Sequence, residues 1–102
     1  MTVDFQVIDA SHARLGGELS FATAADALLA GSRWLAAGSG AASVDCRSLQ
    51  RADSAGLAVL LEWLAIATHA QRTVSFVNLP ESLRQLAAIS EVERWLETPP
   101  DR

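Results

Sequence analysis

The residues best suited to chemistry stand together as Asp53-Ser54-Ala55-Gly56, inside the segment VDCRSLQRADSAGLAVLLEWL of residues 44–64. A helix that begins near Ser54 leaves its first backbone N–H groups unpaired, and its dipole places partial positive charge there. Asp53 or Ser54 can cap those donors, and plain capping is one interpretation of the pair. The small side chains of Ala55 and Gly56 leave the first turn open to another backbone or to a phosphate group. Ser54 is therefore also a candidate phosphorylation site, because the helix start would accept the added negative charge.

The remaining reactive side chains do not form a catalytic or metal-binding pattern. The two histidines, His12 and His69, and the single Cys46 lack the spacing of metal ligands. If Ser54 and His69 lie on one helix, they are roughly 22 Å apart and cannot act as a nucleophile and its base. The sequence also lacks a Gly-rich phosphate loop that ends in Lys-Ser or Lys-Thr. We therefore expect no catalytic residues, no metal ion, no cofactor and a protein that is not an enzyme.

Size and charge narrow the class of protein further. A chain of 102 residues can bury one core and is expected to form one domain. With a net charge of -4, the protein lacks the positive field that would attract nucleic acids or anionic lipid surfaces. The N-terminus does not resemble a secretion signal, and no apolar run approaches the ~20 residues that a membrane span needs. We expect a cytoplasmic protein without nucleic acid or direct membrane insertion, in which Cys46 is a buried, inert thiol.

The elements that must position the Asp53-Ser54 segment alternate along the chain. Period-two alternation predicts two strands in a hairpin, and helical spacing with capping residues predicts three helices. In chain order we expect strands at 3–7 and 13–19, a helix at 24–37 capped by Thr23, a strand at 41–46, a helix at 54–71, a strand at 73–77 and a helix that opens at Pro80. The segment between Asp45 and Asp53 is expected to form a loop. Residues 90–96 predict a helical turn or a short edge strand, and residues 99–102 a flexible tail behind a domain of residues 1–98.

This order of elements predicts an α/β fold. We expect a single domain with a mixed β-sheet of four to five strands and three to four α-helices packed on it. The strand at 41–46, the helix at 54–71 and the strand at 73–77 would form one right-handed crossover.

The helix at 54–71 carries apolar residues on two sides. One side is expected to face the core and holds Leu57, Leu60, Leu61, Leu64 and Thr68. The opposite side holds Ala55, Val59, Trp63, Ile66 and Ala70. Either a neighbouring helix or a partner protein covers this second side. The large aromatic side chain of Trp63 beside an open helix start favours the partner, so we predict a partner-binding surface that comprises residues 53–56, Val59 and Trp63.

The segment of residues 44–64 resembles the signature of STAS domains, in which an apolar strand ends in Asp and a later Asp-Ser-x-Gly-Leu begins a helix. Asp45 matches the first Asp of that signature, Asp53 and Ser54 match its phosphorylatable Asp-Ser pair, and Gly56 matches the helix start. Many anti-sigma factor antagonists of this family carry a second Ser where this chain has Ala55. The resemblance extends over nearly the whole chain. The segments GELSFATAADALLAG and RTVSFVNLPESLRQLA are most similar to the MlaB-type STAS subunits of Mla phospholipid transporters in Gram-negative bacteria.

The resemblance implies a non-catalytic regulatory subunit. Such subunits bind an ABC-transporter ATPase, itself bound to a permease, on the cytoplasmic side of the inner membrane, and so support outer-membrane lipid asymmetry. The ATPase partner hydrolyses ATP, and Ser54 is then a contact residue first. An alternative is an anti-sigma factor antagonist that captures an anti-sigma kinase and is switched off by phosphorylation of Ser54. A third reading is a STAS module that senses a small molecule or nucleotide.

Overall fold

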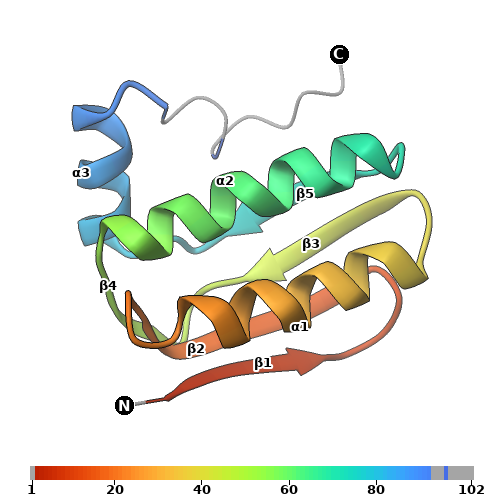
Figure 1. Cartoon of the computed structure of the whole chain (residues 1–102), viewed down its shortest axis with the longest axis horizontal. Coiled ribbons are helices and arrows are strands. Elements are labelled where there is room, and N and C mark those ends of the chain that lie inside the picture. Colours follow the sequence, from red (N-terminus) through yellow and green to blue (C-terminus); the bar gives the residue numbers. More distant parts are fainter. Residues whose placement is uncertain (1, 93–95, 97–102) are drawn as a thin grey trace.

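The predicted order of elements is present in the computed structural model, which describes residues 2–92 and 96. The elements are β1 (Val3–Val7), β2 (His12–Leu19), α1 (Ala24–Ala37), β3 (Ala41–Asp45), β4 (Leu49–Ala52), α2 (Ser54–His69), β5 (Thr73–Val77) and α3 (Glu81–Ile89). Helices α1 and α2 lie side by side across one face of the sheet, and α3 lies at the end of α2 where that helix begins (Figure 1). The predicted α/β fold is confirmed as a five-stranded mixed sheet with three helices in the described residues.

The sheet is built around β2. Strand β1 pairs with β2 in antiparallel register, which confirms the predicted hairpin. The first part of β2 pairs in parallel with β3, and β3 pairs in parallel with β5. The last part of β2 pairs in parallel with β4. Strands β3 and β5 are therefore parallel neighbours joined through α2, as the predicted crossover requires.

Strand β4 was not predicted, because its residues were expected to form a loop. Only Leu49 of its four residues is buried, while Gln50 and Arg51 are exposed. The segment therefore lacks the alternating apolar pattern of a half-buried strand. Its extended form depends on pairing with the end of β2, which is a long-range contact.

The core lies between the sheet and the two helices that cover it. Trp63 is its largest fully buried side chain, and its ring contacts the rings of Phe5 and Phe76, with centroids 5.5 and 6.3 Å away. Gly31 of α1 permits this arrangement, because a Cβ atom there would lie 2.2 Å from the Trp63 ring. The two helices can therefore pack closely over one indole.

The burial pattern of α2 contradicts the predicted division into a core side and a partner side. Its buried residues are Gly56, Leu57, Val59, Leu60, Trp63 and Ala67. Its exposed residues include Ala58, Glu62, Ala65, Thr68 and His69. The side of α2 that faces the core thus lies between the two predicted apolar sides. Each predicted side is buried where it borders this core-facing side and half-buried or exposed farther away. Trp63 and Val59 are covered inside the domain, where α1 packs along α2.

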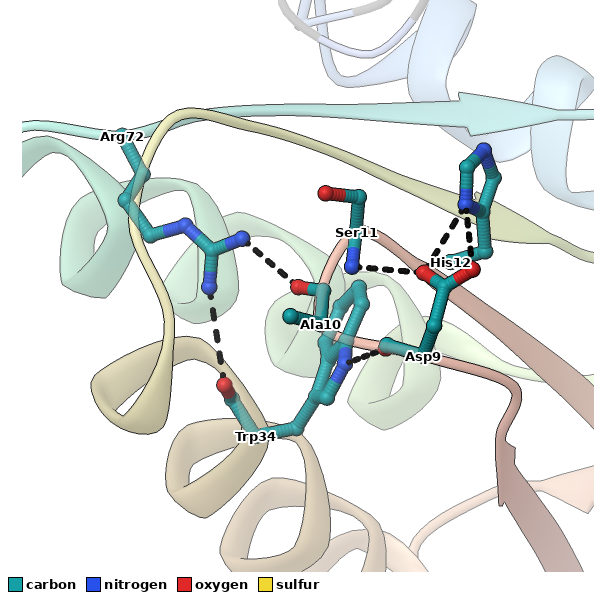
Figure 2. A network of polar contacts seen from close by, with 6 residues as sticks. All are labelled: Asp9, Ala10, Ser11, His12, Trp34 and Arg72. Atoms are coloured by element: carbon teal, nitrogen blue, oxygen red, sulfur yellow. Dashed lines mark hydrogen bonds and ion pairs between the residues drawn. The ribbon is translucent and has the colours of Figure 1, made fainter.

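One buried arginine joins the ends of several elements. The Arg72 guanidinium donates hydrogen bonds to the carbonyls of Leu35 at 2.9 Å, Trp34 at 3.5 Å and Ala10 at 2.9 Å, and its Nε donates to Gly40 at 3.0 Å. Figure 2 shows the guanidinium between the β1–β2 turn and the last turn of α1. Because the last turn of α1 contains no basic residue, Arg72 supplies the positive charge that a helix C-terminus favours.

The β1–β2 turn is held from its other side by Asp9. The Trp34 indole N–H donates to the Asp9 carbonyl at 2.9 Å, and the Asp9 carboxylate accepts the Ser11 N–H at 2.8 Å and contacts the His12 ring at 2.9 Å (Figure 2). The hydrogen bond from Ser11, followed by the contact with His12, lowers the pKa of Asp9 from its ordinary value. The turn is therefore fixed to α1 and to the start of β2.

Several boundaries differ slightly from the prediction. Strand β3 ends at Asp45, and α2 ends at His69. In the segment 90–96, predicted as a helical turn or edge strand, Ser90 and Glu91 form a turn after α3 and Leu96 is helical, while residues 93–95 lie outside the described residues. The predicted tail at 99–102 lies outside them as well. In the described part of the chain, no helix combines the length and the apolar character needed to cross a membrane.

Candidate partner-binding site at the start of helix α2

Asp53 caps α2 and also fixes a neighbouring loop. One carboxylate oxygen accepts the Gly56 N–H at 3.1 Å, and the other accepts the Phe21 N–H at 3.2 Å. Desolvation of the carboxyl opposes its ionisation, but the hydrogen bonds from these backbone groups outweigh that effect and lower the pKa of Asp53. The capping role that the sequence left open between Asp53 and Ser54 thus belongs to Asp53.

The small side chain of Gly56 serves close packing of the helix start. A Cβ atom at this position would lie 2.3 Å from the Leu19 carbonyl oxygen at the end of β2. The Asp53 N–H also donates to that carbonyl, at 3.3 Å. The sequence predicted that either another backbone or a phosphate group could approach this turn. In the structure the backbone of β2 approaches it, and Gly56 is buried.

Ser54 is the first residue of α2 and its side chain is exposed. No hydrogen bond of its hydroxyl to another described residue is present, because Asp53 already provides the cap. A free hydroxyl at a helix start can contact a partner or carry a phosphate without breaking an internal hydrogen bond. Both functional interpretations of Ser54 remain chemically open.

The structure brings together only some of the predicted contact residues. Asp53 and Ser54 are exposed, and Ala55 is half-buried. Trp63, at 1% exposure, lies inside the core and cannot contact a partner without unfolding of the helix pair. Val59 reaches the surface only as part of a shallow groove. Trp63 as a partner contact is therefore wrong, and Val59 can contribute only to the floor of that groove.

Two hollows flank the start of α2. A hollow of about 290 Å³ is lined by Glu18, Ser20, Phe21, Ala22, Arg51, Ala52 and Asp53. A wider groove of about 420 Å³ between α1 and α2 is lined by Ala24, Ala25, Leu28, Ala55, Ala58, Val59 and Glu62. The first is bordered by charged residues, and the second is almost entirely apolar. Asp53 lines the first hollow and Ala55 lines the groove, so Ser54 stands between residues that line the two.

Phe21 was not among the predicted site residues. Its side chain is 85% exposed, the largest exposed fraction among the described large hydrophobic residues. A signal was present in the sequence, because Phe21 interrupts a run of small and polar residues between β2 and α1. The direction of its side chain depends on the loop, which the sequence pattern does not specify.

Asp45 and Cys46, at the end of β3, have structural surroundings. Hydrogen bonds from the Asn78 side chain at 3.1 Å and from the Arg47 N–H at 2.9 Å lower the pKa of Asp45. Asp45 thereby joins the β3–β4 turn to the segment after β5.

Burial, with a smaller effect from the Asp45 charge, raises the pKa of the Cys46 thiol to about 12. The predicted buried thiol is confirmed. The described residues contain no group of three or more His, Cys, Asp or Glu side chains that could hold a metal ion.

The fold is that of STAS proteins. It superimposes on the anti-sigma factor antagonist SpoIIAA in its unphosphorylated form with a TM-score of 0.66 at 13% identity, covering 85% of this chain and 82% of the other. A putative anti-sigma factor antagonist from Thermotoga maritima gives a TM-score of 0.63 at 13% identity, covering 93% of this chain and 83% of the other.

The sequence itself matches the family described as "Mlab, STAS domain" over residues 5–98. The chain therefore belongs to the MlaB type of STAS domain. Comparison with curated protein sequences gives no significant match.

Proposed function

We propose that this protein is the non-catalytic STAS subunit of an Mla-type phospholipid transporter. It binds the ABC ATPase, which is itself bound to a permease, on the cytoplasmic side of the inner membrane. In this role it supports assembly and activity of the complex and, through it, outer-membrane lipid asymmetry. The observation that carries the proposal is membership of the MlaB-type family over nearly the whole chain.

The surface around Ser54 supports this role. It combines an exposed hydroxyl, the exposed small side chain of Ala58 on α2 and an adjoining apolar groove. Small side chains let a partner's backbone approach closely, and burial of an apolar groove is the main favourable term in protein association. A subunit that binds one state of the ATPase better than another stabilises that state. The partner carries out ATP hydrolysis.

A second candidate function is that of an anti-sigma factor antagonist. The fold similarity to SpoIIAA supports it, together with the free hydroxyl of Ser54 at the start of α2. In that role the same surface would bind an anti-sigma kinase, and a phosphate on Ser54 would place charge inside the interface and release the partner.

Purification of the tagged full chain from native membranes, followed by mass spectrometry, separates the two candidates. Stoichiometric recovery of an ABC ATPase and a permease is the result expected for the transporter subunit. Recovery of an anti-sigma kinase, with phosphate on Ser54 and without the ATPase, would establish the second candidate instead. A Ser54→Ala chain purified in parallel reports whether any phosphate found is on that residue.

A further inference from the structure

Phe21 presents an aromatic side chain to solvent at the edge of the proposed interface. Its exposed fraction is 85%, compared with 52% for Leu29 on α1. Large aromatic side chains are among the residues that most often dominate binding free energy in protein interfaces. An exposed phenyl ring contributes little to the hydrophobic core of the domain. The stability of the fold therefore does not explain why a phenylalanine occupies position 21.

The loop that carries Phe21 is held in one conformation. The Thr23 hydroxyl donates to the Glu18 carbonyl at 2.8 Å and accepts the Ser20 N–H at 3.0 Å, and the Thr23 N–H donates to the Ser20 carbonyl at 3.0 Å. The Ser20 hydroxyl donates to the Glu18 carboxylate at 2.6 Å. Thr23 is buried, and these bonds replace the side-chain cap that the sequence predicted for it. A loop that is already ordered loses little conformational entropy when it binds.

The same loop is continuous with the start of α2. The Phe21 N–H donates to one oxygen of Asp53, whose other oxygen caps the helix at Gly56. Phe21 and Asp53 also line the same hollow. The exposed ring and the exposed Ser54 hydroxyl therefore belong to one rigid surface, joined through a single carboxylate.

We propose that Phe21 is the aromatic anchor of the interface with the ATPase subunit, where its ring fills an apolar socket of that partner beside the contact made by Ser54. This inference rests on the proposed function and adds a specific binding residue to it. The hollow beside Phe21 is lined by two acidic residues, Glu18 and Asp53, and by one basic residue, Arg51. Because acidic residues outnumber basic ones there, we expect basic side chains around the partner's socket.

Photo-crosslinking in cells tests the contact directly. The full chain carries p-benzoylphenylalanine at position 21, at position 58 on the exposed side of α2, or at position 29 on α1 as the control. A crosslink to the ATPase subunit from positions 21 and 58, and not from 29, is the expected result. A crosslink from position 58 without one from 21, or equal yields from 21 and 29, would overturn the anchor and leave the proposed function intact. Absence of any crosslink to the ATPase from all three positions would overturn the proposed function, and the anchor with it.

Titration of the purified ATPase subunit with purified variants measures the size of the effect. Phe21→Ala should weaken binding by about 30-fold, as expected for an interface hot spot, whereas Phe21→Tyr should stay close to the original chain. Leu29→Ala, which removes another exposed large hydrophobic side chain, should change affinity by less than about threefold. All three variants should keep the original melting temperature. Equal affinities of Phe21→Ala and Leu29→Ala would refute the anchor.

Discussion

At the residue scale, Asp53 and Ser54 divide two roles between neighbouring side chains. Both oxygens of Asp53 accept backbone N–H groups, one from α2 and one from the loop before α1. Ser54 takes no part in these bonds and faces solvent. A change at Asp53 is therefore expected to disturb the local structure, whereas a change at Ser54 mainly alters the surface proposed to bind the partner.

Substitution of Ser54 should separate folding from binding. Ser54→Thr keeps the hydroxyl, so affinity for the ATPase should survive. Ser54→Asp should leave the free protein as stable as before, because a negative charge at a helix N-terminus contributes ~0.3–1 kcal/mol favourably. In the complex, that carboxylate would lose its water, and an unpaired buried charge costs several kcal/mol. Thermal unfolding and titration with the ATPase measure the two effects. Unchanged affinity of Ser54→Asp would place the interface elsewhere.

Cys46 should react with thiol reagents only when the protein opens. Its side chain is fully buried, and its pKa is raised from 9.0 to about 12. Because the folded state disfavours the thiolate, this contribution to stability is complete below pH 9 and is lost as the pH rises through about 12. Reaction with Ellman's reagent at pH 8 should be slow in buffer and immediate in denaturing urea. A Cys46→Ala chain should lose less stability than the original between pH 9 and 12. Fast native labelling would contradict this account.

At the element scale, α1 and α2 form a closely packed pair around one indole. Gly31 gives the Trp63 ring room, and the indole N–H donates to the Leu28 carbonyl at 3.4 Å. Leu28 also lines the groove between the two helices, which is the apolar part of the proposed interface. Correct packing of the pair is therefore a condition for the binding surface.

Truncation of Trp63 should destabilise the fold as strongly as truncation of an unquestioned core residue. Trp63→Ala is expected to cost about 3–5 kcal/mol and Leu60→Ala about 2–5 kcal/mol, because both side chains are fully buried. Ala58→Asp is the matched control, since Ala58 is exposed on the same helix. It should retain stability and lose affinity for the ATPase. Urea denaturation measures the free energies of unfolding. A stable Trp63→Ala chain with weakened binding would restore Trp63 as a surface contact.

At the scale of the whole molecule, Arg72 connects segments that are distant in the sequence. Its hydrogen bonds reach the β1–β2 turn, the end of α1 and the segment before β3, and its guanidinium lies 5.7 Å from the centre of the Trp34 ring. The planar guanidinium provides several donors in fixed directions, so one side chain can satisfy carbonyls of different elements.

Replacement of Arg72 by lysine should therefore be strongly destabilising, although the charge is kept. A lysine ammonium is a compact group that cannot reach all four carbonyls, and a buried charge that has lost partners costs about 3–5 kcal/mol. Arg72→Met should also destabilise the fold, by leaving carbonyls without donors. The exposed Arg51→Lys is the control and should stay within ~0.5 kcal/mol of the original. Equal midpoints in urea for Arg72→Lys and the original chain would show that the connection is dispensable.

The sequence by itself determined the elements whose signals are local. The alternation of β1 and the β-branched, apolar run of β5 specify strands, and their predicted bounds agree with the structure. The capping residues Asp53 and Ser54, followed by the small Ala55 and Gly56, specify the start of α2, and the predicted start at Ser54 agrees with the structure. These signals depend on neighbouring residues alone, which is why they can be read without a fold.

Only the tertiary structure decided which sides of these elements are covered. Helix α2 is apolar around most of its circumference, so periodicity cannot locate its core side, and the packing of α1 places Trp63 inside. Strand β4 exists because the end of β2 pairs with it, and Phe21 points outward because Asp53 and Thr23 fix its loop. Each of these features depends on contacts between residues far apart in the chain, and the local sequence does not contain that information.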